Sequence, residues 1–320
     1  MELHLASMEN ITCWAFRELF NATDTYTGVL SLNYLLRKRN WKEVDLFPAP
    51  SRQWIQIATA KESECQKFVE RLLREQKENP EKYNVYGIQL NCSCPSPYLT
   101  NIGQGPALIK RTAKVASLVR TLLKQDKFKV SVKTRLGLAE EEVRQGKIFH
   151  LFSELEKIKN PNFVHVVVHF KHAREPSYTP YDYSLLKRIS NCSIPIIING
   201  GINNYNDFLN AIKDANKKNI IGFMMGREAL RNPDCFGDVR NAIISEHQEI
   251  QGISGSKDFD KSFGPKNEKH FFGKRSSEQV KKEFEDNCKL HLPKEIYVRT
   301  IMKYCAWAKN LKIEFPKEAI

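Results

Sequence analysis

The chain has 320 residues, of which 41% are hydrophobic and 27% are charged. This composition is typical of a globular protein rather than a disordered one, and no apolar run is long enough for a membrane-spanning helix. The formal net charge of +13 and the pI of about 9.3 favour a polyanionic partner such as nucleic acid over a merely solvated surface. The first residues, Met-Glu-Leu-His, lack the features of a signal peptide, so we expect a cytoplasmic protein with reduced cysteines.

Short apolar and β-branched runs recur along the first three quarters of the chain. They predict strands at residues 3–7, 27–32, 54–58, 86–90, 129–133, 164–168, 194–198 and 220–225. Most runs are almost continuously apolar, which is the pattern of parallel strands buried on both faces. Helical patterns lie between them, at 64–75, 113–123 and 149–158. The alternation predicts a (β/α)8 TIM barrel, with a doubly wound open sheet as the alternative. No Gly-x-Gly-x-x-Gly follows the first strand, which counts against a dinucleotide-binding version of that sheet.

Polar side chains and glycines stand at the ends of six predicted strands. In chain order they are Gln56, Asn91, Lys133 with Arg135, His169, Asn199-Gly200-Gly201 and Gly226-Arg227. Each has an ordinary structural interpretation when taken alone. Together they are in phase, and the carboxyl ends of barrel strands meet at one mouth. The pattern therefore predicts a single site at that mouth.

The last two strand ends are typical of a phosphate site. Barrels frequently bind phosphate with the loops after strands seven and eight and a short helix. Gly200 and Gly201 let the backbone approach an anion closely, and Arg227 offers a fork of donors. Lys133 and Gln56 face the other end of the ligand, where a flavin ring would meet a cation and an amide. These residues alone leave FMN and a sugar phosphate both open.

The fourth predicted strand ends in a thiol-bearing turn, Asn91-Cys92-Ser93-Cys94-Pro95. A Cys-x-Cys pair without a second pair at suitable spacing is weak evidence for zinc, so we expect no metal. Alternation along an extended segment points Cys92 and Cys94 to the same side, which leaves both open as reactive groups. The following proline favours Cys94.

The chain resembles the tRNA-dihydrouridine synthases, which are FMN-dependent reductases of uridine in tRNA, over almost its whole length. The resemblance is carried by residues 5–12 with Phe16-Arg17, by 88–95 with the glycine-spaced loop 101–108, and by 130–137, 199–201 and 226–233. The chain departs from the family pattern at Ser7, where proline is usual, and at Ser93, where glycine is usual. A third departure is Phe170-Lys171 in place of Gly-Arg.

The resemblance implies a flavin site and a two-step reduction. NADPH would reduce FMN, the flavin would give hydride to C6 of uracil, and Cys94 would protonate C5 as the general acid. The implied cofactor-binding residues are Ser7, Met8, Gln56, Asn91, Lys133, His169, Asn199, Gly200, Gly201, Gly226 and Arg227. A thiol with an ordinary pKa of about 8.5 is mostly protonated at neutral pH and can donate.

The uracil must leave the base stack to reach a buried flavin. We expect Arg135, Lys171, Arg174 and Tyr178 to position it; the alternative for the last three is a solvated loop.

The sequence divides into three predicted regions. Residues 1–245 form the catalytic barrel, 246–276 form a Gly-, Ser- and Lys-rich linker or mobile loop, and 277–320 form a small helical domain. The resemblance implies that this helical domain grips tRNA, and the alternative is a plain packing extension of the barrel. We expect a monomer. Two other functions stay open: an FMN barrel reductase of a small molecule, like dihydroorotate dehydrogenase, and an RNA-binding relative without flavin.

Overall fold

The computed structural model describes residues 1–251 except 10, 39–40, 42–43, 45, 47–48 and 233, together with 279, 282–283 and 285–286. Side chains are described up to residue 246 of the first stretch. The predicted linker at 246–276 and helical domain at 277–320 lie almost wholly outside these residues, so both stay predictions. No helix of the described residues is long and apolar enough to cross a membrane.

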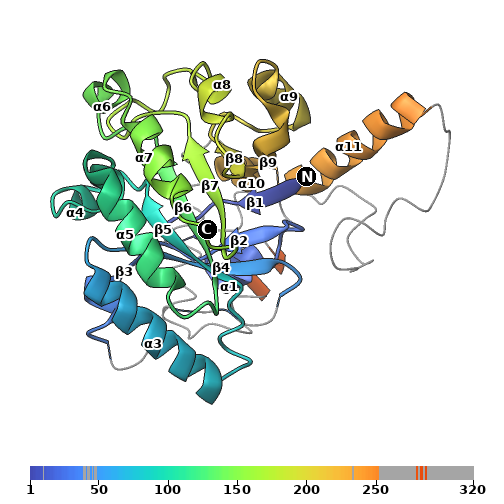
Figure 1. The fold of residues 1–320 in the computed structure, drawn as a ribbon. Coiled ribbons are helices and arrows are strands. Elements are labelled where there is room, and N and C mark those ends of the chain that lie inside the picture. The colour runs from blue at the N-terminus through green and yellow to red at the C-terminus, as the bar shows by residue number, and fades with distance from the viewer. Residues whose placement is uncertain are drawn as a thin grey trace.

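The described residues form a closed barrel of parallel strands (Figure 1). The ladder runs β2-β1-β9-β8-β7-β6-β5-β4-β3, and a further pairing of β2 with β4 closes eight of the strands into a ring. The strands are β1 (Glu2–Leu5), β2 (Asp24–Tyr26), β3 (Leu30–Ser31), β4 (Arg52–Ala58), β5 (Gly87–Cys92), β6 (Lys129–Arg135), β7 (Phe163–His169), β8 (Ile196–Asn199) and β9 (Ile220–Met225). The predicted TIM barrel is confirmed.

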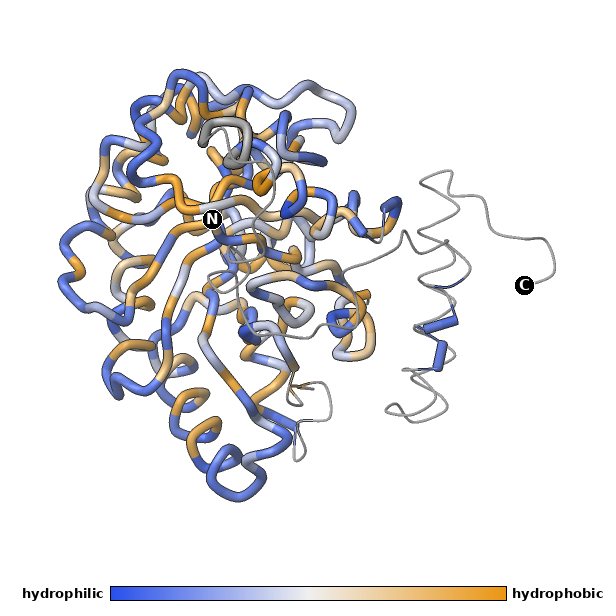
Figure 2. The backbone as a smooth tube through the Cα atoms, turned by 90° about the vertical axis from the view of Figure 1, so that its right-hand side faces the viewer, coloured by the Kyte–Doolittle hydropathy of each residue, from blue (hydrophilic) through white to orange (hydrophobic). Residues whose placement is uncertain are grey.

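Helices surround the barrel (Figure 1). They are α1 (Trp14–Arg17), α2 (Leu32–Leu35), α3 (Glu62–Glu78), α4 (Pro97–Thr100), α5 (Thr112–Leu123), α6 (Glu140–Arg144), α7 (Lys147–Glu156), α8 (Leu186–Ile189), α9 (Tyr205–Ile212), α10 (Arg227–Arg231) and α11 (Cys235–Gln251). Helices α3, α5 and α7 confirm the three predicted helical patterns. Along them, hydrophobic and hydrophilic residues alternate at helical spacing (Figure 2), because only the inner stripe packs on the strands.

The predicted second strand at 27–32 was wrong. The strand that closes the ring is β2, and the two-residue β3 pairs only with β4. The apolar pattern failed because β2 begins with a fully buried charge. The Asp24 carboxylate accepts hydrogen bonds from Arg52 at 2.5 Å and from Trp54 Nε1 at 2.6 Å. A buried, paired carboxylate does not look like a strand residue in sequence.

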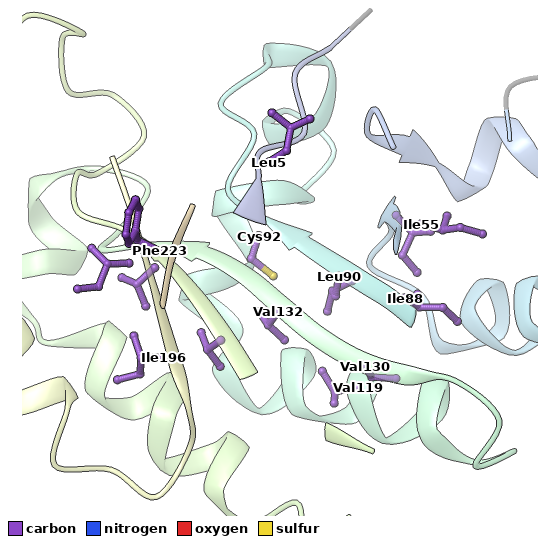
Figure 3. Close-up of a cluster of buried hydrophobic side chains, with 14 of the residues drawn as sticks. Leu5, Ile55, Ile88, Leu90, Cys92, Val119, Val130, Val132, Ile196 and Phe223 are labelled. Carbon is purple, nitrogen blue, oxygen red and sulfur yellow. The ribbon is translucent and has the colours of Figure 1, made fainter. Parts of the chain in front are cut away.

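The hydrophobic core lies between the barrel and its helices (Figure 3). Side chains such as Leu90, Cys92 and Val132 point outward from their strands toward this layer, where Val119 of α5 lies beside Val130 of β6. Because successive strand residues face opposite sides, the intervening residues point into the barrel. This alternation decides which residues can reach the mouth.

A cluster of ionisable side chains lies at the amino-terminal end of the barrel interior. Arg52 pairs with both Glu2 and Asp24, while His4 Nε2 lies 3.1 Å from Glu2 Oε2 and 3.3 Å from Asp24 Oδ2. Burial alone would raise the pKa of Glu2, but its contacts with His4 and Arg52 outweigh burial and lower the pKa to about 2. The guanidinium already supplies the positive charge that these carboxylates need. We therefore interpret the cluster as structural rather than metal-binding.

Substituting Asp24→Asn is expected to lower the free energy of unfolding by about 2–3 kcal/mol, because the change leaves buried donors opposite an amide. Urea denaturation of the full chain measures the effect. The control is Glu140→Gln, which removes one partner of an exposed pair with Arg144 and should cost no more than about 0.5 kcal/mol. Equal effects of the two substitutions would contradict a stabilising role for the cluster.

Candidate active site

A cavity of about 330 Å³ opens at the carboxyl ends of the barrel strands, and its volume suits a small ligand. The structure brings most of the predicted site residues together in its wall: Ser7, Met8, Gln56, Asn91, Cys94, Lys133, Arg135, His169, Asn199, Gly200, Gly201, Gly226 and Arg227. Strand register explains the convergence, since Asn91 lies opposite Lys133 and His169 lies opposite Asn199. The roles assigned to these residues remain predictions.

A row of side-chain amides fixes the floor of the cavity. Asn91 Nδ2 donates to Gln56 Oε1 at 2.7 Å, and Gln56 Nε2 donates to Gln89 Oε1 at 2.6 Å. Gln89 in turn donates to Ser131 Oγ at 3.1 Å. This row sets the orientation of the Gln56 amide, which keeps one N–H and one oxygen lone pair for a ligand. Sequence reasoning missed Gln89 and Ser131, although polar residues inside buried strands were a usable signal.

The turn after β5 presents the Cys94 thiol to the cavity. Asn91 Oδ1 accepts hydrogen bonds from the backbone N–H groups of Ser93 at 3.1 Å and Cys94 at 2.9 Å. Arg135 Nε donates to the Ser93 carbonyl at 2.8 Å, which holds the turn from the neighbouring strand. Burial raises the pKa of the Cys94 thiol. The thiol therefore keeps its proton at neutral pH and can serve as a proton donor.

Cys92 points away from the cavity, so the expectation that both cysteines face the same side was wrong. Cys92 is 1% exposed and packs in the outer core (Figure 3), and burial raises the pKa of its thiol to about 12. The alternation argument failed because β5 ends at Cys92 and the chain turns immediately after it. Of the two cysteines, Cys94 lines the cavity.

Cationic side chains gather at the mouth. Lys133 is 8% exposed, and burial together with the charge of Arg135 lowers the pKa of Lys133 to about 8. Burial likewise lowers the pKa of Arg135, and Arg227 lines the same cavity. Two carboxylates, Glu9 and Glu228, also reach the wall. The cationic side chains outnumber them, which suits an anionic ligand.

His169 is neutral in this environment. Burial, helped by the charges of Arg135 and Lys133, lowers its pKa well below the usual value. Asn199 Nδ2 donates to the Met224 carbonyl at 2.9 Å, so Asn199 Oδ1 is the acceptor for His169 Nδ1 at 3.0 Å. This pairing places the proton on Nδ1 and leaves Nε2 as a hydrogen-bond acceptor.

Glycines shape the end of the cavity formed after β8 and β9. Gly200 and Gly201 have φ values of +95° and +70°, which side-chain-bearing residues rarely adopt. A Cβ on Gly226 would lie 3.2 Å from the Ala6 side chain, so the backbone is closely packed there as well. Ser7 Oγ, on the same wall, is buried without a hydrogen-bond partner among the described residues. This end of the cavity thus combines glycine backbone in the wall with an unsatisfied hydroxyl.

Three predicted substrate residues lie outside the cavity wall. Lys171 is 2% exposed, and its ammonium donates to the carbonyls of Pro176 at 3.0 Å and Ser177 at 3.1 Å. Arg174 lines a separate pocket of about 320 Å³ that also includes Pro95, and Tyr178 is 87% exposed. The wall instead contains Tyr181, which sequence reasoning missed. Residues 178–183 include three tyrosines, and their spacing gave no signal for which one faces inward.

Comparison with known proteins gives a consistent picture. A family model described as "Dihydrouridine synthase (Dus)" matches residues 4–319. The chain is 29% identical over 251 residues to a "Probable tRNA-dihydrouridine synthase" of Helicobacter pylori, covering 75% of this chain and 70% of that protein. It is 28% identical over 159 residues to the tRNA-dihydrouridine(20) synthase of Schizosaccharomyces pombe, whose name includes NAD(P)+, covering 48% of this chain and 31% of that protein. The match therefore spans about a third of the fission-yeast relative.

Proposed function

The chain belongs to the dihydrouridine synthase family, and from this premise we propose that it reduces specific uridines in tRNA to 5,6-dihydrouridine, with FMN as cofactor and NADPH as reductant. The names of similar proteins support tRNA as substrate and NAD(P)H as reductant. The observation that carries the proposal is the geometry of one cavity. It holds a protonated thiol at Cys94 beside the buried cation Lys133, with Arg227 at its phosphate-like end.

The cavity residues fit FMN. The partnerless Ser7 hydroxyl gives a phosphate or ribityl chain a hydrogen-bond donor, in a wall that also contains the backbone of Gly200, Gly201 and Gly226. Arg227 provides the charge for the phosphate, and Lys133 provides a cation for the pyrimidine edge of the ring. Gln56 has one amide N–H left for the same edge. When bound, the flavin supplies the hydride for C6 of uracil.

The chain's own residues handle the proton and the base. Cys94 donates the proton to C5, and Asn91 fixes the turn that carries Cys94. Arg135 holds the same turn and lies in the cavity wall, where it can meet the uracil carbonyls. No step of this proposal uses a metal ion.

The tRNA itself must be held outside the cavity. The net charge of +13 suits a phosphate backbone, and the exposed Arg174 and Tyr178 can contact a phosphate and a flanking base. We assign further contacts with tRNA to the predicted helical domain at 277–320. A monomeric, cytoplasmic enzyme remains the expectation from the sequence.

The proposal predicts a visible redox cycle. The purified full chain should show a flavin spectrum that bleaches with NADPH and recovers on adding tRNA that lacks dihydrouridine. Nucleoside mass spectrometry of the tRNA should then detect the reduced base. Fully modified tRNA serves as the control and should not restore the colour.

Two outcomes would overturn the proposal. Bleaching without any response to tRNA would indicate a reductase of a small molecule. A colourless protein that gains no flavin on adding FMN would indicate an RNA-binding relative.

A further inference from the structure

Tyr181 covers the double-glycine loop at the phosphate-like end of the cavity. A Cβ built on Gly200 would lie 2.3 Å from the Tyr181 ring, and one built on Gly201 would lie 2.6 Å from it. The ring therefore rests directly on the face of the loop where side chains would otherwise stand. The Tyr181 hydroxyl accepts a hydrogen bond from Arg227 Nη2 at 3.2 Å. One side chain thus touches both groups that the proposed function assigns to phosphate.

Lys171 holds the loop that carries this tyrosine. Its buried ammonium donates to the carbonyls of Pro176 and Ser177, and the same nitrogen lies 4.5 Å from the centroid of the Tyr181 ring. His169 packs edge-on against that ring at 5.5 Å between centroids. The ring is thus fixed by a cation, an imidazole and the glycine backbone before any ligand arrives. Such preorganisation lowers the entropy cost of binding.

The hydroxyl of Tyr181 has hydrogen-bonding capacity to spare. A phenol has one donor and two lone pairs, and Arg227 uses one lone pair. The O–H hydrogen can therefore be donated to an anionic oxygen that Arg227 also contacts. Hydrogen bonds to charged oxygens are the strong ones, and the guanidinium retains other N–H groups for the same anion.

We propose that Tyr181 is a binding residue for the phosphate monoester of the ligand, and that Lys171 is the positioning residue that aims it. The inference rests on the proposed function, because it takes that ligand to be FMN. It also gives Lys171 a role different from the substrate contact expected from the sequence. A tyrosine that merely packs on the glycines would make no distinction between a flavin with phosphate and one without.

The first test compares FMN with riboflavin, which lacks the phosphate. Flavin-free full-length chain is titrated with each, and quenching of flavin fluorescence gives the two dissociation constants. The substitution Tyr181→Phe keeps the ring and removes the hydroxyl, so it should weaken FMN binding about tenfold and leave riboflavin binding unchanged. Tyr34→Phe, at a half-exposed tyrosine beside Lys38, is the matched control and should change neither.

The second test asks whether Lys171 acts through Tyr181. Lys171→Met should weaken FMN binding without affecting riboflavin, and the double variant with Tyr181→Phe should bind FMN no more weakly than the weaker single variant. Additive losses would show that Lys171 acts independently, through its own charge. Should Lys171→Met fail to fold, Lys171→Arg keeps the cation and its donors and should preserve the preference for FMN.

The outcomes separate this inference from the proposed function. A wild-type chain that does not bind FMN would overturn both. If the wild-type chain binds FMN more tightly than riboflavin and Tyr181→Phe leaves that preference intact, the inference alone fails. An equal loss of both flavins in Tyr181→Phe would also overturn it, because the hydroxyl would then serve packing rather than phosphate.

Discussion

Replacing Cys94 by alanine is expected to lower the rate of dihydrouridine formation by about 100- to 10,000-fold, which is the usual contribution of a general acid. The loss has a defined physical cause. Burial raises the pKa of this thiol, so at neutral pH the group carries the proton that C5 of the uracil needs. Alanine leaves the turn in place, because Asn91 binds backbone N–H groups there and not the sulfur. The cofactor should stay bound, as judged by the visible spectrum of the purified variant.

The defect should appear in only one half of the cycle. Cys94→Ala should bleach with NADPH at the wild-type rate, and the colour should fail to return on adding unmodified tRNA. Cys92→Ala is the matched control, because Cys92 lies two positions away but packs in the outer core. That change should cost some stability without selectively slowing reoxidation. Normal reoxidation in Cys94→Ala, or its loss in Cys92→Ala, would refute the assignment.

The residues at the mouth of the barrel could be predicted from sequence because the direction of each parallel strand fixes which of its ends lies at the mouth. Side chains at the carboxyl ends of Ile-, Val- and Leu-rich strands must meet at one edge, whatever the helices between them do. Lys133, His169 and Asn199 could therefore be grouped without knowing any distance, and they do line one cavity. The glycine pair at 200–201 could be placed at the mouth for the same reason, because it directly follows strand β8.

Other features depended on tertiary contacts that leave no local trace. Asp24 can begin a barrel strand because Arg52 and Trp54 of another strand, β4, donate hydrogen bonds to its buried carboxylate and offset the cost of burial. The side chains of Cys92 and Cys94 face different sides because strand β5 ends at Cys92 and a turn begins at the next residue. The Asn91 side chain holds that turn by accepting a hydrogen bond from the backbone N–H of Ser93. The sequence around Lys171 predicts a surface cation, but the side chain is buried and its ammonium donates to a loop carbonyl. Each case needed a partner that is distant in sequence or a turn whose start the sequence does not mark.

Replacing Lys133 by methionine is expected to slow flavin reduction by NADPH by about 100- to 1,000-fold, the effect of removing one preorganised electrostatic group. Lys133 is buried beside Arg135, and burial together with that neighbour lowers its pKa to about 8. The ammonium is the group placed to stabilise negative charge on the pyrimidine edge of a reduced flavin. Stopped-flow bleaching measures this step directly. Cys94 does not contribute to the measured rate, because it acts only when tRNA is present.

The pKa of Lys133 predicts how the rate of flavin reduction changes with pH. Lys133 is charged below its pKa and neutral above it, so the wild-type bleaching rate should fall as the pH rises through about 8. A bound anion stabilises the ammonium and moves this fall to higher pH, never to lower pH. Lys133→Met should bleach slowly at every pH, while Lys133→Arg keeps its charge throughout and should show no fall in this range. If the fall near pH 8 persisted in Lys133→Met, another group would be titrating and the role assigned to Lys133 would be lost.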